Sequence, residues 1–226
     1  MLSVGLPTEG WQEERTDHKW SITMDLTSDQ AVNDLPDICR SHFGSFHGLF
    51  HVAGGSGRKF GDGPLHELTD EGWEKTLSLN LSTMMRTNRS AIRALLDQKN
   101  GGSIVNLSTA LVHHPAPTYF TTHAYAAAKA AVNGLSTATA AYYAEHNIRI
   151  NVISPGLTDT PMAQRAINNE NILSYVRGRQ QLSGGRAALP SDMVGMAALL
   201  LSDEASFITG QNIHIDGGWS ISEGKA

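Results

Sequence analysis

Short apolar runs alternate along the chain with longer segments of helical periodicity. Three β-rich runs are bounded by Gly or Pro: Gly102–Ser108, Ile148–Ile153 and Gly210–Gly218. Such runs predict buried strands. Between the first two, the alanine-rich segment His123–Glu145 predicts a long helix. Because strand, helix and strand in this order form a βαβ unit, the sequence predicts a parallel sheet with helices packed on it.

The same pattern extends toward both ends of the chain. Further strands are expected in Trp20–Leu26 and Gly48–Ala53, and the apolar start of Met1–Gly10 has the character of a strand tail. Capping residues and periodicity predict helices over residues 27–42 and 69–98, and a last helix that begins at Pro190.

Two of these helices have an apolar face. The expected faces are Trp73, Leu77, Leu81 and Met84 in the first, and Met193, Met196, Ala197 and Leu200 in the last. Leu157–Leu189, between a strand end and the last helix, is polar and irregular. Because α/β sheets bind ligands at the carboxyl ends of their strands, this segment is expected to be a substrate-covering loop with a short helix.

The composition favours one soluble globular domain over residues 1–226. The chain is 40% hydrophobic and 17% charged, and its net charge of −5 argues against binding a nucleic-acid backbone. Cys39 is the one cysteine, and no signal peptide or run of about 18 apolar residues is recognisable, so a cytoplasmic protein outside the membrane is expected. The ten histidines form no HExxH or Cys/His cluster, so no metal site is expected; His113 and His114 are expected in an exposed loop.

Tyr125 and Lys129 are four residues apart in the long alanine-rich helix, so they share one face. An ammonium beside a phenol favours the phenolate and is expected to lower the tyrosine pKa from its reference value of about 10. The pair therefore predicts an acid–base site. For an isolated Tyr-x-x-x-Lys, the alternative is a solvated helix face with an extended lysine.

Several motifs occur in an order that resembles the short-chain dehydrogenase/reductase family. They are VAGG at 52–55, SLNLS around Asn80, IVNLST at 104–109, YAAAK at 125–129, INVISPG at 150–156 and TGQNIHIDGG at 209–218. The resemblance covers about Met24 to Gly218. It implies a Rossmann-like, doubly wound parallel sheet in a three-layer α/β/α arrangement, and an NAD(P)-dependent oxidoreductase that interconverts an alcohol and a carbonyl by hydride transfer. It also implies a small-molecule substrate and a homodimer or homotetramer, for which Ile208–Trp219 is a candidate interface.

The resemblance assigns a role to each matching position. Tyr125 is expected to exchange the proton, Lys129 to hold the nicotinamide ribose and favour the phenolate, and Asn80 to position a relay water. The serine that orients the substrate oxygen matches Thr109 by position, with Ser108 one residue away, so both are candidates. The expected cofactor-binding residues are Asp25, Ala53, Gly54, Lys129, Pro155, Gly156, Thr158 and Thr160. For Asp25, a turn-capping role is the alternative.

The chain departs from the family pattern at its N-terminus. It has no TGxxxGxG turn to hold the cofactor pyrophosphate, because Gly5 and Gly10 lack that pattern. About one βα unit, on the order of 30 residues, is therefore expected to be missing. A late start codon, a truncation or a natural member with an altered nucleotide site would each explain this. A partner subunit or a rearranged N-terminus would have to cover the gap. The sequence does not distinguish NAD from NADP as the cofactor, because Gly5-Leu6-Pro7 has no charged residue to recognise the ribose 2′ position.

Smaller departures lie inside the matched region. Val52 replaces an asparagine that braces the strand, and the sixteen positions from Thr109 to Tyr125 indicate an insertion in Ala110–Thr122. The loop Gly55–Gly63, which carries Arg58 and Lys59, is expected to be mobile and solvated rather than a phosphate site.

Two other functions are open at this point. Halohydrin dehalogenases resemble the same family and use no nucleotide, although they carry arginine where this chain has Lys129. A non-catalytic subunit of a hetero-oligomer would also lack the glycine turn, although this chain keeps Asn80, Tyr125 and Lys129.

Overall fold

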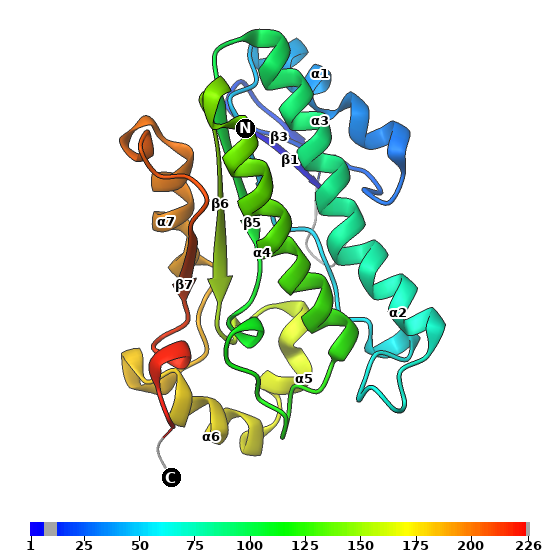
Figure 1. The fold of residues 1–226 in the computed structure, drawn as a ribbon, viewed down its shortest axis with the longest axis vertical. Helices are drawn as coiled ribbons and strands as arrows, with labels where there is room; N and C mark the ends of the chain where they lie inside the picture. Colours follow the sequence, from blue (N-terminus) through cyan, green and yellow to red (C-terminus); the bar gives the residue numbers. More distant parts are fainter. Residues whose placement is uncertain (7–12, 225–226) are drawn as a thin grey trace.

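A parallel four-stranded sheet forms the centre of the computed structural model, which describes residues 1–6 and 13–224 (Figure 1). Its strands lie in the order β4 (Gly48–His51), β5 (Gly102–Leu107), β6 (Ile148–Pro155) and β7 (Asn212–Ile215). All three strand pairs are parallel. The helix α4 (His123–Tyr143) connects β5 to β6, so the predicted βαβ unit is confirmed.

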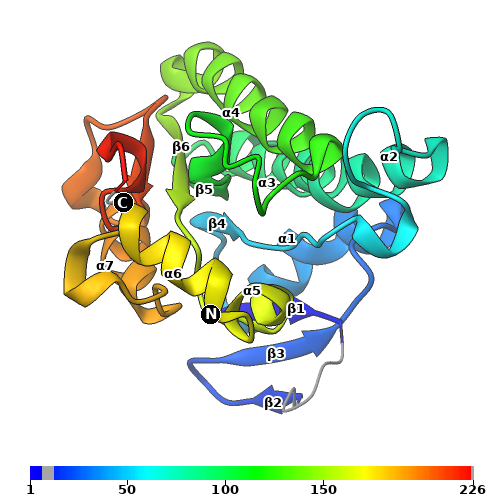
Figure 2. The same cartoon turned by 90° about the horizontal axis from the view of Figure 1, so that it is seen from below.

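The N-terminal strands form a second, separate sheet (Figure 2). It consists of β1 (Leu2–Gly5), β3 (Trp20–Thr23) and β2 (Glu14–Arg15). β1 pairs parallel with β3, and β2 adds a short antiparallel pairing that the sequence did not predict. Within the described residues no strand joins β1 to β4, and Val52, just past β4, is 51% exposed. The Rossmann-like α/β fold is confirmed, with its sheet divided at this point.

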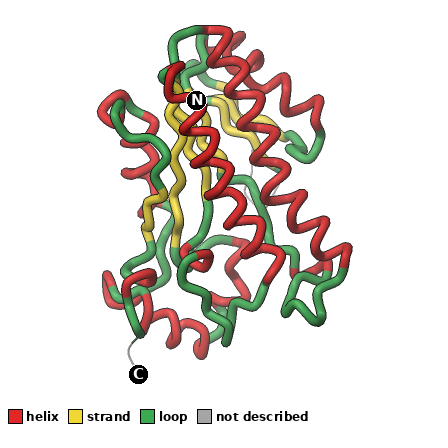
Figure 3. Tube along the Cα trace, viewed as in Figure 1, coloured by secondary structure: helices red, strands yellow, loops and turns green. Residues whose placement is uncertain are grey.

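Helices cover both faces of the four-stranded sheet, so that the strands form the middle layer (Figure 3). α3 (Thr83–Gln98) and α4 pack on one face, with α1 (Asp29–Phe43) against α3, and α7 (Ser191–Leu201) packs on the other. Successive strand residues point to opposite faces: Ile104 packs in the core below α3 and α4, and Val105 packs against α7. This is the expected three-layer arrangement.

A π-helical turn divides the helix that was expected over residues 69–98. The segment forms α2 (Asp70–Leu77), a π turn at Ser78–Ser82, and α3. The expected apolar face is wrong in part, because Trp73 is 41% exposed. From the start of α2 to the start of the second turn of α3, the buried positions are instead mostly small or polar, namely Gly72, Thr76, Asn80, Thr83, Met84 and Thr87. Threonine hydroxyls bonded to helix carbonyls make such a face compatible with burial, and a search for apolar residues does not detect it.

The remaining elements differ from expectation mainly in their boundaries. α7 buries Met193, Ala197 and Leu200, as predicted. The loop expected at 157–189 contains two helices, α5 (Gln164–Ile167) and α6 (Glu170–Arg179). Residues 7–10 of the predicted strand tail lie outside the described residues. No helix in the described part of the chain is long and apolar enough to cross a membrane.

Candidate active site

A buried carboxylate fixes the N-terminus of α4. Asp62 Oδ1 accepts the N–H of Ala124 and Oδ2 accepts the N–H of Tyr125, each at 3.0 Å. A negative charge at this end also complements the helix dipole. The loop Gly55–Gly63 is therefore attached to α4, which corrects the expectation of a mobile solvated segment. The sequence did not indicate this contact because Asp62 and Ala124 are 62 residues apart.

Tyr125 and Lys129 lie one turn apart on α4, as predicted. Lys129 Nζ is 5.7 Å from the centre of the Tyr125 ring and donates a hydrogen bond to Leu107 O at 2.8 Å. The lysine is buried. The Tyr125 hydroxyl forms no hydrogen bond with any residue in the described part of the chain. It is therefore free to bond a ligand.

Burial determines the acidity of both groups. It raises the pKa of Tyr125 to about 12 and lowers the pKa of Lys129 to about 8, because each charged form loses solvation. The expected lowering of the tyrosine pKa by the ammonium is therefore wrong for this structure. Desolvation of the phenolate outweighs attraction over 5.7 Å, and the ammonium donates to Leu107 O instead.

The two hydroxyl candidates after β5 make different contacts. Ser108 Oγ donates to Lys129 O at 3.1 Å, which ties the strand end to α4. Thr109 Oγ1 accepts the N–H of Leu111 at 3.3 Å, so its own hydroxyl proton is left to donate elsewhere. Ser108 therefore braces the strand end, whereas Thr109 keeps a hydroxyl proton that can be donated to a ligand.

Asn80 joins the π turn to the loop after β4. Its Nδ2 donates to Thr76 O and Gly55 O, both at 2.9 Å, and its Oδ1 accepts the N–H of Gly55 at 3.2 Å. A Cβ on Gly54 would lie 2.6 Å from Asn80 Oδ1 and 3.6 Å from Lys129 Nζ. Asn80 thus fixes the backbone beside the lysine, and only glycine fits at position 54 without displacing the amide.

His51, at the end of β4, is a buried residue near Lys129 that no sequence motif indicated. Its Nδ1 lies 2.9 Å from Thr87 Oγ1. Burial, and then the charge of Lys129, lower its pKa to about 4. The imidazole is therefore neutral near pH 7 and adds no second positive charge beside the ammonium.

Tyr125, Ser108 and Thr109 line a cavity of about 500 Å³ at the carboxyl ends of β5 and β6, whereas Asn80, Lys129 and His51 are not among the residues that line it. The cavity brings together most of the predicted site residues: Ser108, Thr109, Tyr125, Pro155, Gly156, Thr158 and Thr160. Ala53 and Gly54 lie in the adjoining loop after β4. Asp25 is exposed after β3, where its Oδ1 accepts the N–H and the hydroxyl of Thr27 at 2.8 and 2.7 Å. That contact matches the alternative, turn-capping role of Asp25.

Much of the cavity wall is apolar, and part of it is aromatic. The rings of Phe120 and Trp219 pack edge to face with centres 5.9 Å apart, and both line the cavity. Trp219 is buried and donates its indole N–H to His114 O at 3.3 Å. The insertion Ala110–Thr122 therefore packs on Trp219 and removes it from the surface expected at an oligomer interface. No sequence pattern linked the two segments.

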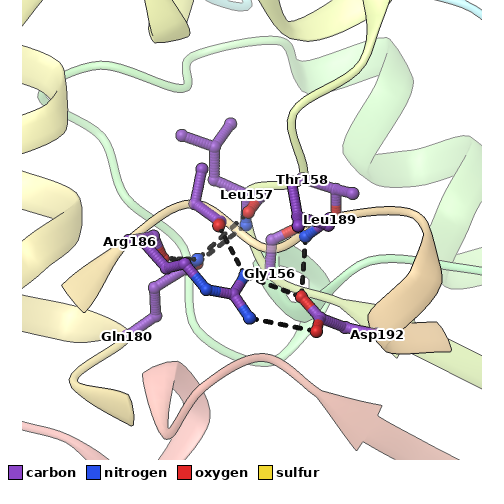
Figure 4. A network of polar contacts seen from close by, with 8 residues as sticks. Gly156, Leu157, Thr158, Gln180, Arg186, Leu189 and Asp192 are labelled. Carbon is purple, nitrogen blue, oxygen red and sulfur yellow. Dashed lines mark hydrogen bonds and ion pairs between the residues drawn. The ribbon is translucent and has the colours of Figure 1, made fainter. Parts of the chain in front are cut away.

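A buried glutamine connects the two ends of the loop between β6 and α7 (Figure 4). Gln180 Oε1 accepts the N–H of Leu157 at 2.9 Å, and its Nε2 donates to Leu157 O at 3.0 Å and to Arg186 O at 2.9 Å. Arg186 in turn forms a two-point ion pair with Asp192 at 2.7 and 3.0 Å. These contacts set the position of the Pro155–Thr160 segment that lines the cavity.

Gln180→Ala is expected to lower the free energy of unfolding by roughly 1–3 kcal/mol, because part-buried backbone groups of Leu157 and Arg186 lose their hydrogen-bond partner. Urea denaturation measures the change. Gln30→Ala, an exposed glutamine on α1, is the control and should have little effect. Equal stability of the Gln180 variant and the wild type would show that the glutamine does not hold this loop.

Comparisons with known proteins agree with this fold. A family model described as enoyl-(acyl carrier protein) reductase matches residues 9–220. Cis-4-hydroxycyclohexanecarboxylate dehydrogenase of Sinomonas cyclohexanicum is 32% identical over 199 residues, 88% of this chain and 76% of the relative. The 2-dehydro-3-deoxy-D-gluconate 5-dehydrogenase of Escherichia coli K12 is 29% identical over 88% of this chain and 75% of its own. A solved short-chain type dehydrogenase/reductase from Mycobacterium ulcerans has a TM-score of 0.82 at 30% identity, with 91% of this chain and 72% of that chain covered. The chain therefore belongs to the short-chain dehydrogenase/reductase family of oxidoreductases.

Proposed function

We propose that this protein interconverts an alcohol and a carbonyl by hydride transfer with NAD or NADP. The observation that carries the proposal is the pair formed by half-buried Tyr125 and buried Lys129, whose phenol hydroxyl is unbonded in the described structure and lies in a cavity beside Thr109. A positioned proton donor next to a second hydroxyl is what reduction of a carbonyl oxygen requires.

Each polar group has one task in this proposal. In reduction, Tyr125 Oη donates its proton to the substrate oxygen, and in oxidation it accepts that proton. The Tyr125 pKa of about 12 keeps the phenol protonated, and the Lys129 pKa of about 8 keeps the ammonium charged at pH 7, where it stabilises a phenolate that forms. Thr109 donates a hydrogen bond to the same substrate oxygen, with Ser108 as the brace. Asn80 holds the adjoining loop and is the proposed position of a relay water.

The surroundings of Lys129 fit the nicotinamide half of NAD or NADP. The ammonium supplies donors for ribose hydroxyls, and glycine at position 54 keeps a side chain away from it, since a Cβ there would lie 3.6 Å from Lys129 Nζ. Thr158 and Thr160 place hydroxyls at the cavity for the carboxamide or a phosphate. Bound there, the cofactor supplies the hydride donor or acceptor.

The residues of this chain match the pyrophosphate half of the cofactor less well than the nicotinamide half. The chain contains no TGxxxGxG turn, and β1 and β4 lie in different sheets. Asp25 and the backbone of Ala53 are the proposed contacts to the adenosine half. We therefore expect affinity for the dinucleotide to come mainly from the Lys129 side of the site.

The substrate is proposed to be a small secondary alcohol with an apolar body. The ring alcohol in the name of the Sinomonas relative and the apolar walls of this cavity support it. A homodimer or homotetramer is proposed as the working assembly. The fully exposed Phe207, next to the candidate interface Ile208–Trp219, supports a contact near β7.

Turnover of cyclic secondary alcohols with NAD or NADP, combined with titration of NADH and NADPH followed by fluorescence, tests the function. Saturable cofactor binding with turnover is the expected result. Halide release from a halohydrin, without binding of either nucleotide, would favour a dehalogenase. Neither binding nor either activity would favour a non-catalytic subunit.

Asp62→Asn is expected to weaken both the fold and the activity. The amide keeps one acceptor oxygen and loses the charge, so an N–H at the start of α4 is left unbonded; we expect a loss of about 1–2 kcal/mol in the free energy of unfolding. Because Tyr125 N–H is one of the two donors, turnover should fall roughly tenfold. Denaturation and steady-state kinetics measure these changes. Asp34→Asn, at an exposed position on α1, serves as the control. An Asp62→Asn protein with unchanged stability and turnover would show that Asp62 does not anchor the start of α4.

A further inference from the structure

Two arginines from distant parts of the chain meet at the active-site cavity. Arg58 follows β4 and Arg165 lies on α5, and both line the cavity together with Tyr125. Burial, and next the charge of Arg165, lower the pKa of Arg58. Both arginines are partly exposed to solvent and line the same cavity, so an anion bound inside it would face two positive charges.

Neither arginine forms an ion pair within the described residues. The Arg58 side chain has no hydrogen bond there, and Asp62, whose charge favours the Arg58 guanidinium, uses both of its oxygens for backbone N–H groups of α4. Arg165 donates one N–H to Tyr119 O at 2.9 Å, which leaves donors on the same guanidinium for a ligand. The pair thus offers unbonded positive donors beside apolar walls.

We propose that Arg58 and Arg165 bind the carboxylate of the substrate while its hydroxyl or carbonyl group lies at Tyr125. The inference rests on the proposed function and narrows its substrates to hydroxy acids and oxo acids with an apolar body. Planar guanidinium groups match the geometry of a carboxylate, and a cavity of about 500 Å³ has room for such a small molecule. A phosphate of the cofactor has the same anionic chemistry, and the experiment separates the two.

Binding of cyclohexanecarboxylate and of its neutral analogue cyclohexanecarboxamide, measured by calorimetry on the full chain, tests the pair without any turnover. We expect the wild type to bind the carboxylate at least about tenfold more tightly than the amide, as hydrogen bonds to charged groups do. The double variant Arg58→Gln/Arg165→Gln should lose this preference. Arg93→Gln, an exposed arginine on α3 outside the cavity, should keep it.

Kinetics add an independent readout. In the double variant, kcat/KM for 4-hydroxycyclohexanecarboxylate should fall about tenfold to a hundredfold, mainly through KM, while kcat/KM for cyclohexanol stays within about twofold.

Equal wild-type affinity for carboxylate and amide would overturn the proposal. A double variant that loses NADH affinity but keeps the carboxylate preference would assign the arginines to a cofactor phosphate and overturn it too. Failure of the proposed function has a different signature: neither alcohol is turned over although the carboxylate preference is present.

Discussion

Tyr125→Phe is expected to reduce turnover by about two to four orders of magnitude while the protein stays folded. The phenol hydroxyl is the proposed proton donor, and no other described side chain on α4 replaces it at the cavity. Because this hydroxyl bonds no described residue, its removal leaves no buried partner unsatisfied. We therefore expect the free energy of unfolding to change by less than about 1 kcal/mol. Steady-state rates and thermal unfolding on the same sample measure both effects.

Tyr142→Phe is the matched control for this experiment. Tyr142 lies on the same helix and is 68% exposed, so its variant should keep the wild-type rate. A Tyr125→Phe protein with wild-type turnover would show that another group exchanges the proton. Unfolding of the Tyr125 variant would instead show that the hydroxyl has a structural role.

Lys129→Met is expected to abolish cofactor-dependent turnover and to change how stability depends on pH. The pKa of Lys129 is lowered from 10.5 to about 8 in the folded protein. Between these pH values the folded wild type has released the proton while the unfolded chain still holds it, so wild-type stability rises with pH across the window. Below pH 8 the folded protein bears the full cost of the buried ammonium. Relative to the variant, the wild type should therefore gain about 3 kcal/mol from pH 8 to pH 10.5.

The comparison of the two proteins isolates this one group. Other titrating residues are shared and cancel in the difference, and the lost hydrogen bond to Leu107 O adds a nearly constant offset. Urea denaturation at a series of pH values measures the difference. Lys75→Met, which removes an exposed lysine on α2, is the matched control. A pH-independent difference between wild type and Lys129→Met would mean that the ammonium does not titrate near pH 8.

Local patterns were sufficient for most of the fold. Apolar runs predicted β4, β5, β6 and β7, and alanine-rich composition predicted α4 to within a few residues of its end. Spacing along one helix also placed Tyr125 and Lys129 on a common face. These features were predictable because strand pattern, helix propensity and helical spacing depend on residues close together in the chain.

The features that the sequence did not predict depend on contacts between segments that are distant in the chain. The π turn at Ser78–Ser82 and the polar buried face around Thr76 and Asn80 were missed because their burial depends on α4 and the loop after β4. The sequence likewise gave no measure of desolvation, which reversed the expected direction of the Tyr125 pKa. Burial is a property of the packed molecule, and neither periodicity nor spacing contains it.

By itself, the sequence determined the parallel α/β fold, the family resemblance and the choice of Tyr125 and Lys129 as the candidate pair for proton exchange. Only the tertiary structure decided what surrounds that pair: the Asp62 anchor of α4, the Gln180 brace of the cavity loop, and the two arginines at the cavity. Each of these contacts joins segments that are separated along the chain. Their distances and charges arise when the sheet and helices pack, so no local pattern encodes them.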